Sequence, residues 1–160
     1  MQGCNVFYTG SAGTGKSAIL RAFKKRLMAM GKRVVVTAPT NLAALNVGGI
    51  TLFSYAGWRP QTNEESIGLM IEKLIGQDKD KTIATHLQET DVLVIDEISM
   101  LESNAFRRLN AMMKYARESS EPFGGVQMVV TGDVSYCSFM LPYSQLLTSI
   151  VLSTTTSETF

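Results

Sequence analysis

The sequence predicts an α/β fold in three layers, with a mostly parallel sheet covered by helices on both faces. Apolar runs of strand length alternate with segments of helical periodicity, the runs are almost continuously apolar, and a glycine-rich turn joins the first run to the first helix. Strands that are apolar on both faces are typical of a parallel sheet buried between helices. The 160 residues are enough for one domain of this kind.

Four apolar runs are the expected strands. Each is rich in β-branched or aromatic residues, and each ends at a residue that is typical of a turn or of a polar site. They are residues 5–9 (NVFYT), 33–38 (RVVVTA), 92–95 (VLVI) and 126–131 (VQMVVT).

Helices are expected where apolar residues recur at every third or fourth position. The first begins at Lys16 and ends near Gly31, where a glycine permits the left-handed stop of a helix. The polar run 78–81 (DKDK) is expected to be a solvated connection that precedes another short helix. The remaining helices are expected over residues 40–47, 64–75 and 101–116.

The composition indicates an ordinary globular chain and excludes several classes. The formal net charge is +1, with 45% hydrophobic and 18% charged residues, so neither disorder nor a globally basic nucleic-acid binder is indicated. Cys4 and Cys137 are too few and too far apart for a disulfide framework or a zinc site, which favours a reducing compartment. No apolar run approaches the length of a membrane span and no signal-peptide pattern is present, so we expect a soluble protein without a membrane partner.

The glycine-rich turn is the most specific chemical signal in the chain. It reads GSAGTGKS and meets the pattern GxxxxGK[ST], in which glycines let backbone amides turn toward a polyphosphate. In that pattern Lys16 reaches the β- and γ-phosphates and Ser17 places its hydroxyl on Mg²⁺. A chance glycine-rich turn is the alternative, but an expected strand precedes this one and an expected helix follows it. The nucleotide-binding residues are therefore predicted to be Gly10, Ser11, Ala12, Gly13, Thr14, Gly15, Lys16 and Ser17.

A pair of carboxylates at the end of the third strand narrows the chemistry. A phosphate loop alone does not separate an ATPase from a nucleotide kinase or a GTPase. Asp96 can hold Mg²⁺ together with Ser17, and the adjacent Glu97 can position and deprotonate an attacking water. The alternative is a pair of solvated carboxylates at the end of a strand. We therefore predict ATP and Mg²⁺ as ligands, with Lys16, Asp96 and Glu97 as the catalytic residues.

Four segments together resemble one known family. They are VFYTGSAGTGKS, TAPTNLAALNVGGITLFSYAGW, DVLVIDEISMLE and PFGGVQMVVTGD. These resemble the Pif-type (petite integration frequency) DNA helicases, in the RecD-like branch of superfamily one, and the YAGW wording resembles fungal members. The match covers most of residues 5–133, and IDEISM and PFGG are more specific than a generic ATPase signature.

The resemblance implies a RecA-like P-loop domain that uses ATP to drive 5′ to 3′ movement on single-stranded DNA. It also implies roles in DNA repair, recombination and telomere maintenance, in the nucleus or the mitochondrion. By the same resemblance, Thr40 and Asn41 are expected to contact the DNA backbone. Phe53, Tyr55 and Trp58 are candidate platforms for stacked bases, each stacked base being worth ~1–3 kcal/mol, but aromatic residues at such spacing are also typical of a core.

The chain departs from the family pattern at both ends. Relatives begin upstream with a glutamine that recognises adenine, whereas residues 1–4 alone precede the first strand here. After Asp133, relatives carry a glutamine that senses the γ-phosphate, and Tyr136 stands in its place. We therefore divide the chain into a partial helicase domain, 1–133, and a divergent tail, 134–160. Because Val134 and Ser135 can be encoded by an intron donor sequence, the tail is interpreted as a translated intron or an artefact of the gene model.

Two functions from different classes follow. The first is the helicase ATPase domain, truncated and unable to unwind DNA alone because the arginines of a second motor domain are missing. The second is an inactive nucleotide- or DNA-binding remnant that acts as an interaction module. A small nucleotide kinase would need several arginines after the last helix, and only Arg117 follows Arg107 and Arg108. ATPase activity with and without single-stranded DNA separates the first two functions.

Overall fold

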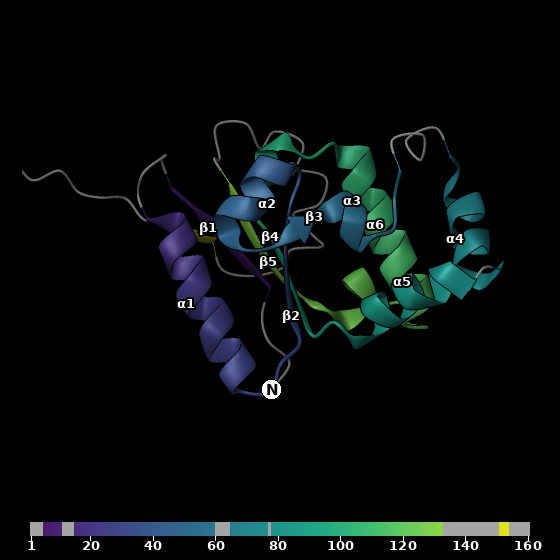
Figure 1. The fold of residues 1–160 in the computed structure, drawn as a ribbon, viewed down its shortest axis with the longest axis horizontal. Coiled ribbons are helices and arrows are strands. Elements are labelled where there is room, and N and C mark those ends of the chain that lie inside the picture. The colour runs from purple at the N-terminus through teal and green to yellow at the C-terminus, as the bar shows by residue number, and fades with distance from the viewer. Residues whose placement is uncertain (1–4, 11–14, 60–64, 77, 133–150, 154–160) are drawn as a thin grey trace, which may run out of the picture.

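The computed structural model describes residues 5–10, 15–59, 65–76, 78–132 and 151–153 as a single α/β unit (Figure 1). The strands are β1 (Val6–Thr9), β2 (Val34–Ala38), β3 (Ile50–Thr51), β4 (Val92–Ile95), β5 (Gln127–Gly132) and β6 (Val151–Ser153). The α-helices are α1 (Lys16–Ala29), α2 (Asn41–Val47), α3 (Leu52–Tyr55), α4 (Ile67–Gly76), α5 (Asp78–Glu89) and α6 (Ser103–Ala116). Two short 3₁₀ helices are η2 (Ile98–Met100) and η3 (Pro122–Gly125).

The strands form one sheet in the order β3-β2-β4-β5-β1-β6, and every pair of neighbours is parallel. Parallel neighbours need crossover connections, which the helices supply. All carboxyl ends of the strands therefore lie along the same edge of the sheet. This confirms the α/β class with a parallel sheet.

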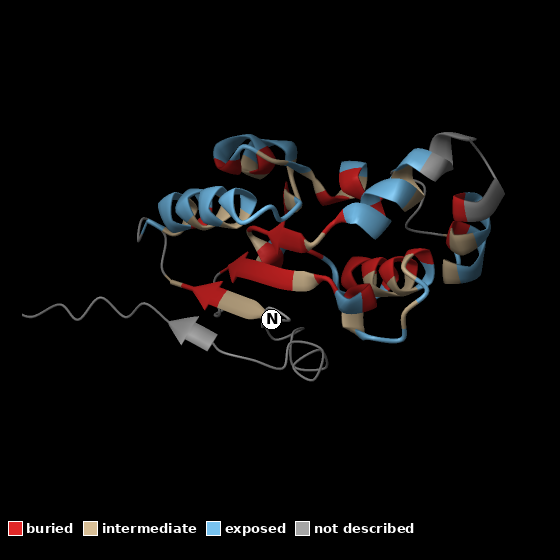
Figure 2. Ribbon diagram, turned by 90° about the horizontal axis from the view of Figure 1, so that it is seen from below, coloured by how far each residue is buried: buried red, intermediate tan, exposed pale blue. Residues whose placement is uncertain are grey.

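Helices cover the two faces of the sheet unequally. On one face, Leu20, Phe23 and Leu27 of α1 pack with Val36, Val94 and neighbouring side chains from the strands and α2. The other face carries α3 to α6 over a much larger core. Figure 2 shows the central strands as buried, whereas the outer side of α1 is exposed. Among the described residues, no helix is both long and apolar enough to cross a membrane.

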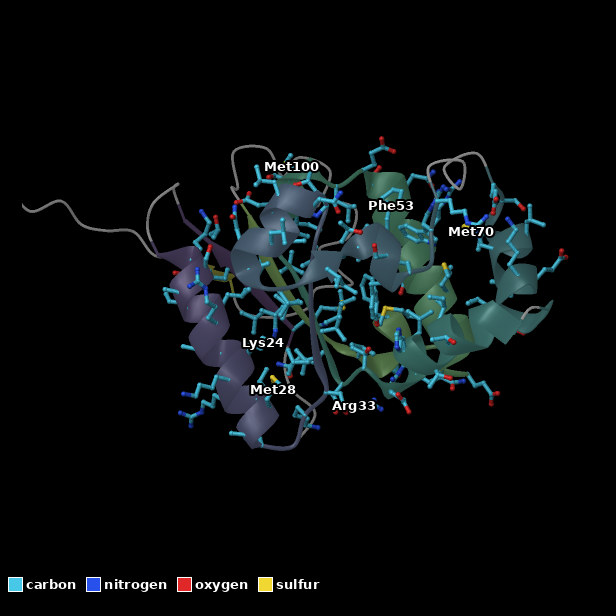
Figure 3. The ribbon with its side chains drawn as sticks, in the orientation of Figure 1. Lys24, Met28, Arg33, Phe53, Met70 and Met100 are labelled. Carbon is cyan, nitrogen blue, oxygen red and sulfur yellow. The ribbon has the colours of Figure 1, made fainter. Side chains whose placement is uncertain are left out.

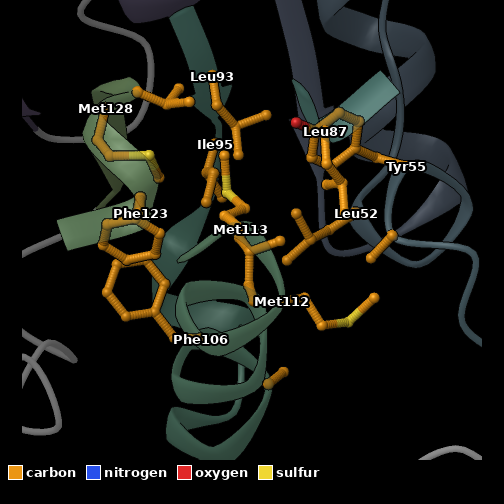
Figure 4. Close-up of a cluster of buried hydrophobic side chains, with 14 of the residues drawn as sticks. Leu52, Tyr55, Leu87, Leu93, Ile95, Phe106, Met112, Met113, Phe123 and Met128 are labelled. Carbon is orange, nitrogen blue, oxygen red and sulfur yellow. The ribbon is translucent and has the colours of Figure 1, made fainter. Parts of the chain in front are cut away.

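The larger core is built from long, flexible and aromatic side chains. The rings of Phe106 and Phe123 pack against each other with centroids 4.8 Å apart, and both are fully buried (Figure 4). Met112, Met113 and Met128 fill the space around them (Figure 4). Methionine suits such irregular gaps because its unbranched side chain adapts to its neighbours.

The PFGG segment is a tight turn locked to the end of α6. Gly124 has φ +63°, and a Cβ there would lie 2.6 Å from the Met113 carbonyl oxygen, so glycine is required. The Arg117 guanidinium donates hydrogen bonds to carbonyl oxygens of Gly124 at 2.8 Å and of Thr90 at 3.1 Å, and to those of Leu87 and Gln88. One side chain thus ties α6 to η3 and to the start of β4.

Several expectations are refined by the structure. The four predicted strands are present as β1, β2, β4 and β5, within one residue of their expected bounds. The expectation for residues 78–81 was wrong, because α5 begins at Asp78 and these residues form its first turn. The segment between α2 and Trp58, left without an expected element, forms β3 and α3. Of the tail 134–160, the described residues are those of β6, which pairs with β1.

Candidate nucleotide and nucleic-acid site

The predicted nucleotide residues gather at the carboxyl edge of the sheet. β1 ends at Thr9 and leads into the glycine-rich turn, and β4 ends immediately before Asp96. β5 is the single strand between them in the sheet. Ligands of open parallel sheets bind outside this edge, so the fold brings the phosphate loop and the acidic pair to the place where a nucleotide would bind.

The phosphate loop is described at its two ends. Residues 11–14, which hold Ser11, Ala12, Gly13 and Thr14, lie outside the described part of the chain. Gly15 has φ 82° and ψ 15°, a left-handed conformation that glycine adopts without steric cost. The Lys16 ammonium donates a hydrogen bond to the Gly10 carbonyl oxygen, with Nζ and O 2.5 Å apart. The lysine side chain therefore reaches back across the loop rather than into bulk solvent.

The start of α1 favours an anion. Its N-cap is Gly15, no side chain caps it, and its first turn holds no acidic residue. By contrast, α2 begins with a capped turn, in which the Thr40 hydroxyl oxygen accepts the Ala43 N–H at 3.2 Å. Because the start of a helix carries partial positive charge, phosphate can take the place of a side-chain cap at α1.

Asp96 is held by a neighbour on β5. Its carboxylate accepts a hydrogen bond from the Thr131 hydroxyl, and both residues are buried, at 5% and 0% exposure. The register explains the contact, since Ile95 pairs with Val130 and the next residues along each strand lie level. The Asp96 N–H also donates to the Thr37 carbonyl oxygen at 2.8 Å. Asp96 is therefore fixed from both adjacent strands.

Glu97 adopts a backbone conformation that is uncommon for its type. It has φ 53° and ψ 45°, and its carbonyl oxygen accepts the Met100 N–H at 3.0 Å to begin η2. A left-handed residue other than glycine costs roughly 1–3 kcal/mol, and such strain is typical of functional positions. Unlike Asp96, Glu97 is partly exposed. The turn thus gives the two adjacent carboxylates different environments.

The donors at this edge suit a magnesium ion. Ser17 offers a hydroxyl and Asp96 a carboxylate, and Mg²⁺ prefers a few oxygen ligands of this kind, with the remainder from water and phosphate. In the described ranges no group of three or more His, Cys, Asp or Glu side chains could hold a metal. Ser17 and Asp96 thus fit a metal whose remaining ligands are water and phosphate oxygens.

The residues expected to contact DNA lie on the same edge, beyond β4. Thr40 and Asn41 follow β2, and Phe53 follows β3, which pairs with β2 through Ala38 and Thr51. Thr40 is partly buried as the cap of α2, and Asn41 is exposed at the first position of that helix. Nucleotide and DNA candidates thus occupy neighbouring stretches of one edge.

The candidate stacking residues differ in burial. Trp58 is 9% exposed within the larger core, and its Nε1–H points to the Met112 sulfur at 3.0 Å. This burial favours the core alternative for Trp58, and Tyr55, at 1% exposure, belongs to the same core. Phe53 is half-buried and meets the Trp58 ring edge-on, with centroids 5.4 Å apart. Of the three, Phe53 therefore remains the candidate platform.

Two residues of this site were not predicted from the sequence. Thr131 bonds Asp96, and Gly132 follows it against η2, where an added Cβ would lie 2.9 Å from Ile98 Cγ2. Both belong to the VVTGD string. That string signalled the end of a strand, but the contact with Asp96 depends on a strand order that no local pattern specifies.

Comparison with known proteins agrees with this geometry. A family model described as PIF1-like helicase matches residues 1–157. The chain belongs to this family. The match extends through most of residues 134–160, whose separate origin stays a prediction.

Individual PIF1-like relatives show the same likeness. The chain is 45% identical over 134 residues to the ATP-dependent DNA helicase PIF1 of Candida albicans, covering 83% of this chain and 14% of that protein. It is 41% identical over 140 residues to the ATP-dependent DNA helicase RRM3 of Saccharomyces cerevisiae, covering 86% and 18%. The chain therefore spans less than a fifth of the length of either relative.

Solved PIF1-like structures share the fold. The crystal structure of Pif1 helicase from Candida albicans superposes with a TM-score of 0.73 at 44% identity, covering 81% of this chain and 29% of that one. Pif1 helicase from Bacteroides, in complex with ADP-AlF3 and single-stranded DNA, superposes with a TM-score of 0.65 at 33% identity, covering 84% of this chain and 29% of that one. The first motor domain of such helicases is RecA-like, which agrees with the sheet described above.

Proposed function

We propose that this chain is the nucleotide-binding motor domain of an ATP-dependent DNA helicase that moves 5′ to 3′ on single-stranded DNA. Its context would be DNA repair, recombination and telomere maintenance, in the nucleus or the mitochondrion. One observation carries the proposal. The phosphate loop and the Asp96–Glu97 pair meet at the carboxyl edge of one parallel sheet, a single strand apart. Names of relatives support the proposal, including a Pif1 bound to single-stranded DNA and a nucleotide analogue.

Binding of the nucleotide begins at the start of α1. Phosphate oxygens would replace the Gly10 carbonyl oxygen as the partner of the Lys16 ammonium, which is a stronger, charge-assisted contact. The uncapped first turn of α1 adds favourable partial charge. Ser17 and Asp96 are the residues that would hold Mg²⁺, which when bound neutralises charge on the phosphates. Thr131 keeps the Asp96 carboxylate in place for that role.

Hydrolysis needs a water aligned with the terminal phosphate. Glu97 is partly exposed next to Asp96, at a left-handed turn where β4 has ended. It would orient the water and accept its proton. Charge that develops in the transition state needs further cations, and an arginine finger is worth roughly a thousandfold or more in related phosphoryl transfers. The 160-residue chain taken alone is expected to bind nucleotide well and to hydrolyse it slowly.

Contact with DNA would use the far stretch of the same edge. Asn41 is exposed at the start of α2, and Phe53 lies in α3, which follows the neighbouring strand β3. Proteins commonly bind single-stranded DNA without sequence specificity by a polar side chain that contacts the DNA backbone and an aromatic ring that stacks on a base. A nucleotide at β1 and a strand of DNA at β2 would then share one rigid sheet.

The test is a steady-state ATPase assay of the purified chain with and without single-stranded DNA, alongside Glu97→Gln. We expect slow hydrolysis that Glu97→Gln abolishes while nucleotide binding stays within about twofold of wild type. If nucleotide binds but neither DNA nor Glu97→Gln changes a background rate, the chain is the inactive remnant instead. ATP-driven strand displacement by the 160 residues alone would contradict the expected need for further cations.

A further inference from the structure

The charge of the chain is divided sharply along its length. No Asp or Glu precedes Glu64, whereas eight of the fifteen Lys and Arg residues do. All fourteen acidic residues lie from Glu64 onward; four of them are in α4 and α5, and α6 carries none. Although the net charge of the chain is near zero, α1 on one face of the sheet carries five Lys and Arg residues and no acidic one, and the adjacent α2 is uncharged. Charge asymmetry of this kind indicates an anionic partner.

A groove of about 600 Å³ lies between α1 and the end of α2. Lys24 joins its two walls, since its ammonium donates a hydrogen bond to the Gly48 carbonyl oxygen at 3.2 Å. Figure 3 shows Lys24 and Met28 together on α1. The described residues that line the groove are Arg21, Lys24, Lys25, Met28, Leu45, Asn46, Val47 and Gly48.

The groove offers apolar contacts as well as cations. Leu45 is 75% exposed and Met28 is 55% exposed, and Leu42, one turn before Leu45 on α2, is 71% exposed. Two of these large exposed apolar side chains lie on α2, which has only seven residues, and the third lies on α1. Several exposed apolar side chains on neighbouring helices are typical of an interaction surface. They provide sites for apolar anchors, and Arg21 and Lys25 provide partners for carboxylates.

We propose that this groove binds an acidic amphipathic helix of a partner protein. Apolar side chains on one face of that helix would contact Leu42, Leu45 and Met28, and Glu or Asp residues beside them would pair with Arg21 and Lys25. An amphipathic helix laid in an apolar groove is a recurrent mode of recognition, and complementary charge sets its orientation and rate of binding. The interaction is distinct from the nucleotide chemistry of the proposed function.

The lining favours a protein over a nucleic acid. Phosphates would use the cations but would leave Leu45 and Met28 in water, and no aromatic residue for base stacking is among the described residues of the groove. The groove is also set apart from the nucleotide. Met28 lies twelve residues after Lys16 on α1, which is roughly 18 Å along a helix. The Met28 end of the groove is therefore well separated from the phosphate loop, whereas Arg21 lies five residues after Lys16 on the same helix.

The experiment is a fluorescence anisotropy titration of the chain with labelled 18-residue helical peptides. Each carries Leu or Phe at every third or fourth position with Glu beside them, and scrambled peptides of identical composition are compared. A twelve-nucleotide single strand is the third probe. Two variants are tested. One combines Arg21→Glu with Lys25→Glu, and the other is Leu45→Ala alone. The matched control is Arg26→Glu with Arg107→Glu, because both arginines are exposed outside the groove lining. Circular dichroism confirms that each variant is folded.

We expect amphipathic peptides to bind at micromolar concentration. The charge-reversed pair should weaken binding at least tenfold and Leu45→Ala severalfold, while the control pair stays within twofold. The proposal would be overturned if no peptide bound, or if scrambled peptides bound equally well. It would also be overturned if the charge-reversed pair lost binding of the single strand but kept binding of the peptides. So would a dimer that Leu45→Ala dissociates in sedimentation, since the groove would then bind a second copy.

Discussion

The Thr131 hydroxyl donates a hydrogen bond to the Asp96 carboxylate, and both side chains are buried where β4 and β5 end. The contact connects Asp96, the proposed magnesium ligand that follows β4, to a residue near the end of the adjacent strand β5. It also leaves the carboxylate with a fixed orientation before any metal arrives. Positioning of this kind lowers the cost of ordering a site when its ligand binds.

Thr131→Val tests this contact directly. Valine keeps the shape of threonine but cannot donate to the carboxylate, and a hydrogen bond to a charged group contributes about 1.5–3 kcal/mol. We expect nucleotide affinity measured with Mg²⁺ to fall roughly tenfold, while affinity measured with EDTA changes little. Thr131→Ser, which restores the hydroxyl, is the control and should recover most of the loss. Equal affinities of the valine and serine variants would show that the contact does not prepare the metal site.

Arg117 is expected to be a large contributor to stability. Its guanidinium donates hydrogen bonds to carbonyl oxygens on η3, on α5 and on the connection between α5 and β4, and Arg117→Ala leaves those oxygens without it. We expect the free energy of unfolding to fall by about 3 kcal/mol, measured by urea denaturation. Arg107→Ala is the matched control, because the exposed Arg107 donates a single hydrogen bond of 3.0 Å to the Asn104 side chain, and it should cost less than about 0.5 kcal/mol. Similar losses for both variants would contradict the role of Arg117.

Tyr55 is expected to make the fold sensitive to alkali. Burial raises the pKa of its hydroxyl from 10.0 to about 12, against opposing effects of the Thr90 hydrogen bond and Arg117. The folded state therefore holds the proton more tightly than the unfolded state. Its stabilising effect is complete below pH 10 and is lost as the pH rises through 12, with a total of about 3 kcal/mol.

Tyr55→Phe removes this dependence. At pH 7 the variant should be less stable by about 1 kcal/mol, because the 3.0 Å hydrogen bond to Thr90 is lost. Between pH 10 and 12 the difference should shrink and then reverse, since phenylalanine cannot ionise. Urea denaturation of both proteins at a series of pH values measures the difference in stability at pH 7 and its reversal at alkaline pH. Parallel stability curves for the two proteins would show that another group governs the alkaline range.

Phe53 and Trp58 are expected to separate DNA binding from stability. Phe53→Ala should weaken single-strand binding by ~1–3 kcal/mol with little loss of stability. Trp58→Ala should instead cost about 3–5 kcal/mol of folding free energy, because its ring is buried in the core. Tyr115→Ala, at an exposed aromatic on α6, is the control for both measurements. Unchanged DNA affinity in Phe53→Ala would remove this residue from the DNA-binding surface.

The contrast between these two aromatics shows what the sequence could predict. Lys16, Asp96 and Glu97 were predictable because they belong to short, contiguous sequence motifs that directly follow apolar strands. Phe53 and Trp58 share one such segment, and spacing alone could not show which ring turns inward. The role of Thr131 could not be predicted for a related reason. Its partner, Asp96, lies 35 positions away in the sequence, and the contact depends on the order of the strands. The α5 start at Asp78 was misread, since a run of charges is equally compatible with a helix and a loop.

The measurement that tests the central claim most directly is calorimetric titration of the chain with MgATP, for wild type, Lys16→Ala and Lys25→Ala. Loss of the Lys16 ammonium removes a charge-assisted contact to phosphate worth about 1.5–3 kcal/mol, so affinity should fall roughly tenfold to hundredfold. Lys25→Ala removes the same charge from the same helix, nine residues beyond Lys16, and should stay within twofold of wild type. Equal affinity of all three proteins, or no binding by wild type, would contradict the assignment of residues 10–17 as the nucleotide site.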